Sequence, residues 1–235
     1  MNVNEVMQEL EALGKERTKK IYLSNGAHEP LFGVATGAMK PMAKLIKKNQ
    51  PLAEQLYATG NYDAMYFAGV IAEPKVMTHA DFDRWMDAAY FYMVSDYVVA
   101  VTLAETDIAQ NVADTWIASG EELRMSGGWS CYCWLLGSRK DTEFEEEKLR
   151  QMLEQVEQTI HTAPERAKIA MNLFIYTVAM SYVPLHELAV ETAKRVGPLE
   201  VGLDKPKSKQ ISASDNIQKA LDRNQLGFKR KYVRC

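Results

Sequence analysis

The chain has 235 residues, of which 47% are hydrophobic and 25% charged, and a formal net charge of −3. This composition is ordinary for a soluble, well-packed protein. No apolar run approaches the ~20 residues that a membrane span needs. Acidic residues near the N-terminus stand where a signal peptide would be basic, so the sequence predicts a cytoplasmic protein with no membrane partner.

Apolar residues recur every three or four positions along most of the chain and predict one short amphipathic helix after another. Helices are expected in the first half over 3–23, 36–48, 50–59, 62–71, 78–89 and 94–104. Thr36 is expected to cap the second of these, and Thr78, with Asp81 three residues later, to cap the fifth. A short apolar turn is expected at 31–34.

The second helix carries four lysines, with no acidic residue among them. They are Lys40, Lys44, Lys47 and Lys48. Their spacing is interpreted as one helix face. Two interpretations stay open, a simply solvated face and a ridge that contacts phosphates.

Asp96 lies within the apolar segment 94–104. Two interpretations stay open. In the first, Asp96 has a structural role, as a helix cap or as a buried carboxylate bonded to the backbone or to an arginine. In the second, it is a functional carboxylate with a perturbed pKa.

Helices in the second half are expected over 107–118, 121–136 and 144–160, and two more begin at Pro164 and Pro184. Gly127 and Gly128 each cost ~1 kcal/mol relative to alanine inside a helix, so they predict close helix packing. Five large apolar side chains are expected to point inward from successive helices: Phe82, Trp85, Leu153, Leu173 and Phe174.

The composition changes after Gly197-Pro198, a helix stop. The segment to residue 214 is interpreted as loop, 215–223 as a short helix, and 227–235 as a basic tail. We therefore expect a helical-repeat domain over 1–197 and a basic extension over 198–235.

Charge is segregated along the chain. Residues 61–160 hold 18 acidic and 7 basic residues, whereas 204–235 hold 9 basic and 3 acidic. Such blocks either present a cationic face to a polyanion, or allow the tail to neutralise the acidic middle within the fold. Three tail residues are candidates for DNA contact: Lys229, Arg230 and Lys231.

Three cysteines and four scattered histidines show no spacing typical of a metal site or a disulfide framework. Cys131 and Cys133 are expected to be buried thiols and Cys235 a free one. We expect neither a metal nor a cofactor.

The helices fall into pairs roughly 40 residues apart, which is typical of HEAT-like repeats. The predicted fold class is all-α, an α-α superhelix of the HEAT or armadillo type, which offers a curved surface for an elongated partner.

Several stretches resemble the bacterial DNA alkylation repair family, the AlkD-like HEAT-repeat proteins. They are KERTKKIYLSNGAHEPLFGV (15–34), KPMAKLIKKNQPLAEQLYATGNYDAMYFAGVIAEP (40–74), MTHADFDRWMDAAYFYMVSDYVVA (77–100) and GFKRKYVRC (227–235). The resemblance implies a concave helical stack that holds double-stranded DNA, alkylated or branched. Active members of the family are glycosylases that remove cationic 3-methyl and 7-methyl purines.

The resemblance also implies a catalytic set. Asp96 matches the family's aspartate, Tyr92 stands where the family has a tryptophan, and Arg124 best matches its arginine. Phe174 or Tyr176 lies nearest to the second tryptophan position. The carboxylate would stabilise positive charge developing on the sugar, and the aromatic faces would add cation–π attraction. Arg124 would anchor the phosphate of the lesion strand.

Both tryptophans are therefore replaced in this chain. The sequence implies an alkylpurine DNA glycosylase, and the alternative is a non-catalytic helical scaffold that binds DNA structures or a protein partner.

Overall fold

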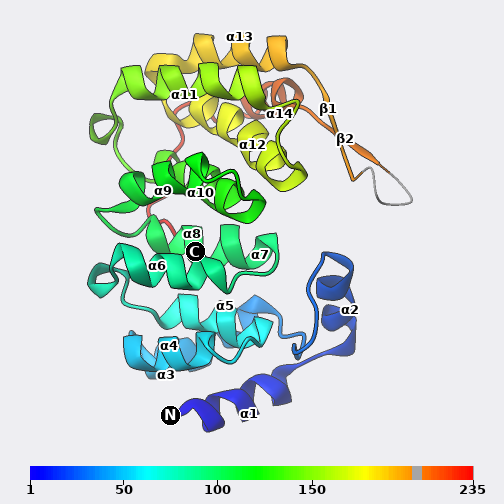
Figure 1. The fold of residues 1–235 in the computed structure, drawn as a ribbon, viewed down its shortest axis with the longest axis vertical. Coiled ribbons are helices and arrows are strands. Elements are labelled where there is room, and N and C mark those ends of the chain that lie inside the picture. The colour runs from blue at the N-terminus through cyan, green and yellow to red at the C-terminus, as the bar shows by residue number, and fades with distance from the viewer. Residues whose placement is uncertain (203–207, 235) are drawn as a thin grey trace. The chain divides into compact units, whose positions relative to one another are not determined.

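The structure is a computed structural model that describes residues 1–202 and 208–234 (Figure 1). The expected thiol at Cys235 lies outside the described residues. The chain forms two compact units, Met1–Asp107 and Ile108–Cys235, and each is described by itself. The division expected from the sequence, between a helical-repeat domain over 1–197 and a basic extension over 198–235, stays a prediction.

The first unit is built from short helices joined by tight turns (Figure 1). Its α-helices are α1 (Val3–Leu13), α2 (Glu16–Ser24), α3 (Lys40–Ile46), α4 (Gln50–Tyr57), α5 (Tyr62–Ile71), α6 (His79–Asp87), α7 (Tyr92–Val94) and α8 (Ala100–Leu103). Two 3-10 turns, η1 (Thr36–Met39) and η2 (Pro74–Val76), and one π-helical turn, η3 (Ser95–Val99), complete it.

Side-chain caps define several of these helix starts. The predicted cap at Thr78 is confirmed, because its side chain accepts from the Asp81 amide while the Asp81 carboxylate accepts from the Thr78 amide at 2.8 Å. Asn61, which the sequence analysis missed, accepts from two amides at the start of α5. The predicted cap at Thr36 is wrong, because η1 begins there with no side-chain cap bond.

The long helix expected over 3–23 is interrupted at Gly14. A Cβ on Gly14 would lie only 2.6 Å from the Phe32 carbonyl oxygen, so the apolar turn packs directly on the break. The Lys15 amide donates to the Gly33 carbonyl at 3.1 Å. The turn therefore supplies an acceptor for the Lys15 amide, which in a continuous helix would donate to a carbonyl of that helix.

The same turn is held from its other side by Asp63 on α5. The carboxylate accepts from the amides of Phe32 at 2.6 Å, Gly33 at 3.0 Å and Val34 at 2.8 Å. Asp63 is fully buried. Burial raises the pKa of this carboxyl above its ordinary value, and the three backbone bonds oppose that shift.

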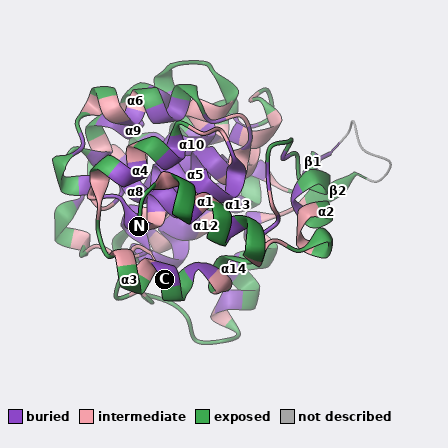
Figure 2. Cartoon of the chain, turned by 90° about the horizontal axis from the view of Figure 1, so that it is seen from below, coloured by how far each residue is buried: buried purple, intermediate pink, exposed green. Residues whose placement is uncertain are grey.

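The second unit has a helical core. Its α-helices are α9 (Ala109–Ala118), α10 (Glu122–Leu136), α11 (Glu146–Thr159), α12 (Glu165–Ser181), α13 (His186–Val196) and α14 (Ala213–Leu221), with 3-10 turns η4 (Asp141–Glu143) and η5 (Val183–Leu185). The central helix is α10, which packs against α9 and α12. It is mostly buried (Figure 2).

The glycine pair in α10 permits this close packing at Gly128. A Cβ there would lie 2.7 Å from the Ala113 carbonyl oxygen and 2.8 Å from the Ile117 side chain. Distances under 3.0 Å are not tolerated by real Cβ atoms, so α9 approaches α10 as closely as glycine allows. The prediction of close packing is confirmed at this position.

Four of the five side chains predicted to be inward are buried: Phe82, Trp85, Leu153 and Phe174. The prediction for Leu173 is wrong, because that side chain is 40% exposed. Cys131 and Cys133 are buried as predicted. Burial raises the pKa of the Cys131 thiol well above its ordinary range.

The interpretation of 197–214 as loop is wrong in part. Helix α13 ends at Gly197 as predicted, and the chain then forms β1 (Leu199–Val201) and β2 (Lys209–Ile211). These strands pair antiparallel, with Glu200 opposite Gln210. Three residues are too few for an alternating pattern to stand out in the sequence.

Across the described ranges, no single helix is long and apolar enough to cross a membrane. Helix α12 and the segment Val183–Val196 pass that test only as a pair, which is bent by 110°.

Candidate functional site

Asp96 lies in the π-helical turn η3, between α7 and α8. A π-helical turn adds a residue to the helical repeat and is frequent at functional sites. The Asp96 side chain is only 4% exposed, and one of its oxygens accepts a hydrogen bond from the Ser95 hydroxyl at 2.7 Å. Asp96 is therefore a buried carboxylate bonded to the hydroxyl group of its neighbour, and its functional role stays a prediction.

Tyr92 begins α7, four residues before Asp96, and is half-buried. Its ring makes edge contacts with Phe91 at 5.9 Å and with Tyr97 at 6.3 Å between centroids. Tyr97 is 44% exposed. Tyr92 and Asp96 thus lie in one short helical stretch, and the ring of Tyr92 contacts the exposed ring of Tyr97.

Arg124 belongs to the second unit, in the first turns of α10. Its side chain is 17% exposed, and its Nε lies 3.3 Å from the carboxylate of Glu121. An arginine held by an exposed acid can exchange that partner for a phosphate. Its role as a phosphate anchor stays a prediction.

Phe174 is not available to a ligand. It is fully buried in α12, with its ring 5.0 Å from Trp129 and 6.2 Å from Tyr132 between centroids. Of the two residues nearest the second tryptophan position, only the half-buried Tyr176 reaches the surface. This chain therefore lacks a large exposed aromatic face at the Phe174 position.

The four lysines near α3 are all exposed. Lys40 and Lys44 lie four residues apart on α3 and share a face, but the helix ends at Ile46, and Lys47 adopts a left-handed conformation with φ of 62°. The prediction of one continuous helix face is therefore wrong for Lys47 and Lys48. The Lys48 ammonium donates to the Val70 carbonyl at 3.1 Å.

Two cations of the basic tail face the other elements of the second unit, to which the tail belongs. The Lys229 ammonium lies 2.6 Å from the Asp141 carboxylate and donates to the Leu136 carbonyl at 3.1 Å. The Arg230 guanidinium lies over the Trp134 ring, 4.5 Å from its centroid. Lys231 is exposed. The tail thus neutralises part of the acidic region at Lys229 and remains open to a partner at Lys231.

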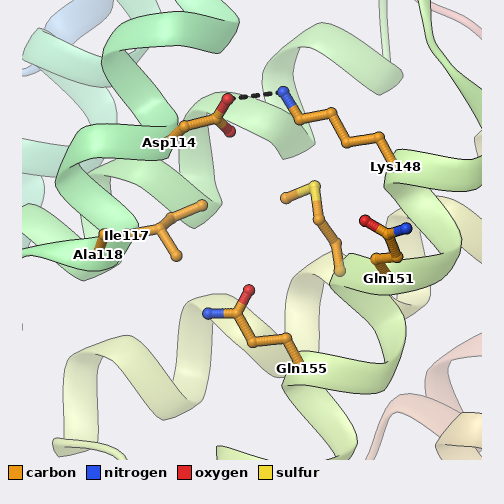
Figure 3. Close-up of a pocket in the computed structure, with 7 residues that line it drawn as sticks. Asp114, Ile117, Ala118, Lys148, Gln151 and Gln155 are labelled. Atoms are coloured by element: carbon orange, nitrogen blue, oxygen red, sulfur yellow. Dashed lines mark hydrogen bonds and ion pairs between the residues drawn. The ribbon is translucent and has the colours of Figure 1, made fainter.

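Figure 3 shows a pocket of about 280 Å³ between α9 and α11. Its rim holds Asp114, which accepts from the Lys148 ammonium at 2.6 Å and from the Tyr132 hydroxyl at 2.6 Å. Both oxygens of the carboxylate are thereby engaged. Asp114 and Lys148, the acid and the base among the lining residues, are therefore paired with each other.

Within the described part of the chain, no group of three or more His, Cys, Asp or Glu side chains is arranged to hold a metal ion. The residue that sequence reasoning missed is Asp63, which positions the 31–34 turn. The one available signal was the Asn61 cap motif, which places Asp63 in the first turn of α5.

The succession of short paired helices defines a helical-repeat protein. A family profile described as DNA alkylation repair enzyme matches residues 6–203. The chain therefore belongs to the DNA alkylation repair enzyme family, and the resemblance and the HEAT-like fold predicted from the sequence are confirmed.

Two curated relatives are uncharacterized proteins of Listeria. The protein from Listeria monocytogenes is 30% identical over 220 residues, which cover 92% of this chain and 95% of the relative. The protein from Listeria innocua is 29% identical over 221 residues, with the same coverage.

A solved structure matches the whole of both chains at 72% sequence identity, with a TM-score of 0.97. It is described as a new family of proteins related to the HEAT-like repeat DNA glycosylases, with affinity for branched DNA structures.

Proposed function

We propose that this chain binds branched DNA as a structure-selective helical-repeat protein, and that base excision is not its main activity. The observation that carries the proposal is the similarity, over the full length of both chains, to a protein described as having affinity for branched DNA structures. The exposed Lys40 and Lys44 support it, because paired cations on one helix face suit phosphates.

The test compares a four-way DNA junction with a linear duplex of the same arm sequence, by fluorescence anisotropy. We expect tighter binding to the junction. Binding to both is expected to weaken steeply with salt, with a log–log slope near −0.9 for each phosphate contact on duplex DNA.

The charge dependence is tested with matched double variants. Lys40→Ala with Lys44→Ala is expected to weaken binding to every DNA and to reduce the salt slope by about 2, one for each lost contact. Lys75→Ala with Lys219→Ala removes two other exposed lysines and is expected to leave both quantities nearly unchanged. Absence of binding at micromolar protein and low salt would contradict the proposal.

A second candidate function, alkylpurine glycosylase activity, is favoured by one observation, the retention of Asp96 four residues after Tyr92. A cationic 7-methylguanine loses its charge on leaving, so the enzyme would need no strong general acid. The carboxylate would need only to stabilise charge on the sugar.

We expect the wild-type protein to release no methylated base above the spontaneous rate, because Asp96 is only 4% exposed and Phe174 is buried. Base release from methylated DNA by the wild type and Asp96→Asn, measured side by side, checks this. Release by the wild type that is lost in Asp96→Asn at unchanged DNA affinity would instead establish the glycosylase.

A further inference from the structure

The most exposed aromatic rings of the described chain lie on the C-terminal tail. Phe228 and Tyr232 are each 64% exposed, more than Tyr97 at 44%. Leu226, an apolar side chain without a ring, is 44% exposed on the same segment. Exposed aromatic rings grouped on one segment are a mark of a binding surface.

The backbone that carries these rings is fixed to the second unit. The Gly227 amide donates to the Met180 carbonyl at 2.8 Å, and the Arg230 amide donates to the Gly137 carbonyl at 2.7 Å. These bonds hold the tail on either side of Phe228. Because the backbone is already fixed, only the side chain of Phe228 loses conformational freedom when it binds a partner.

The side chains of the tail divide into two sets. Lys229 and Arg230 turn inward, to Asp141 and Trp134. Phe228, Lys231 and Tyr232 are exposed, and the Lys231 ammonium lies 5.3 Å from the Tyr232 ring centroid. The inward cations hold the tail in place, and the outward set combines two exposed aromatic side chains with a positive charge.

Aromatic rings beside cations are the recognition chemistry of unpaired nucleotides. Bases stack on the rings, and the cations follow the phosphates. A continuous duplex hides its base faces within its own stack, so the rings have no partner there. A branch point that carries a flap or a gap exposes such faces.

We propose that Phe228, Lys231 and Tyr232 form a stacking site for unpaired nucleotides of branched DNA. This inference rests on the proposed function and adds the ligand class to it. The site is separate from Arg124, because Arg124 and Gly137 lie near opposite ends of α10, about 20 Å apart at the rise of a helix.

The test uses the full chain and four DNA probes: a linear duplex, a fully paired four-way junction, the same junction with an oligothymidine flap, and the oligothymidine alone. Phe228→Ala with Tyr232→Ala is expected to weaken binding to the two probes with unpaired thymines about thirtyfold, at the low end of what two stacked bases contribute. Binding to the duplex and to the paired junction should change less than about twofold.

Two controls separate stacking from other effects. Leu226→Ala removes an exposed apolar side chain from the same segment without removing a ring, and Tyr232→Phe keeps the ring without its hydroxyl group. Both should bind all four probes like the wild type. An equal loss on all four probes, or no loss on any, would overturn the stacking site.

The outcomes also distinguish this inference from the proposed function. If the wild type prefers the paired junction to the duplex, and the double variant binds the flap and the oligothymidine as well as the wild type does, the proposed function is retained and the stacking site is overturned. If binding to oligothymidine depends on the two rings but the wild type shows no preference for the junction, the stacking site is retained and the proposed function is overturned. Loss of self-association with unchanged DNA affinity would identify the rings as a protein contact and overturn the inference.

Discussion

Replacing Phe174 by alanine is expected to lower the free energy of unfolding by about 3–5 kcal/mol. The side chain is fully buried, and its ring contacts Trp129 and Tyr132 on α10. Helix α10 is itself held against α9 at Gly128. The surrounding helices therefore have little freedom to close the cavity, and the cost should lie in the upper part of the range for such substitutions.

The neighbouring residue supplies the matched control for this substitution. Leu173 lies on the same helix but is 40% exposed, so Leu173→Ala should cost less than about 1 kcal/mol. Urea unfolding of both variants, followed by circular dichroism, gives the comparison. Similar losses for the two would show that the burial of Phe174 does not govern the stability of this region.

The pair also shows why helix positions could be predicted more surely than helix faces. In MNLFIYTVAM almost every residue is apolar, so the pattern predicts a helix but defines no narrow buried stripe. Leu173 and Phe174 then look equally suited to the core. Only the packing of α10 and α13 against α12 decides between them.

A local motif can be predicted from the sequence where its two partner residues are close together in the chain. The capping box of Thr78 and Asp81 spans three residues. The contact of Lys229 with Asp141 joins distant segments, and no spacing rule reveals such a pair. The left-handed Lys47, which ends α3, gave no signal either, because lysine rarely adopts that conformation.

The candidate site likewise combines a feature that the sequence reveals with one that it does not. The spacing of Tyr92 and Asp96 is visible in the sequence, but the π-helical turn that encloses Asp96 is not. Burial changes what the carboxylate can do, since an enclosed oxygen bonded to Ser95 is less accessible to a sugar than an open one. The chemistry of the site therefore depended on a feature that only the structure contains.

Removing the Asp63 carboxylate should have an effect as large as removing the Phe174 ring. Three amides, those of Phe32, Gly33 and Val34, donate to this one group. A buried donor left without an acceptor costs about 1–3 kcal/mol. Some of these amides would regain water, so we expect Asp63→Ala to lower the free energy of unfolding by about 3–5 kcal/mol.

The geometry predicts a graded response in Asp63→Asn. One carboxylate oxygen accepts from Phe32 and Gly33, and the other from Val34. In Asp63→Asn the amide oxygen can take the place of the oxygen that accepts from Phe32 and Gly33, and these two bonds are kept. The NH₂ group then faces the Val34 amide, which loses its acceptor. The loss in the free energy of unfolding should therefore be about half that of the alanine variant. Asp222→Ala, at an exposed position, should be nearly neutral and serves as the control.

Hydrogen exchange locates the damage in the Asp63 variants. The amides of Phe32, Gly33 and Val34 should exchange faster in Asp63→Ala than in the wild type, well before global unfolding, because their acceptor is gone. In Asp63→Asn the Val34 amide should exchange fastest of the three, since it alone loses its oxygen. Unchanged protection of all three amides in Asp63→Ala would mean that the turn is held by its packing on Gly14 and α2, and that the carboxylate is dispensable.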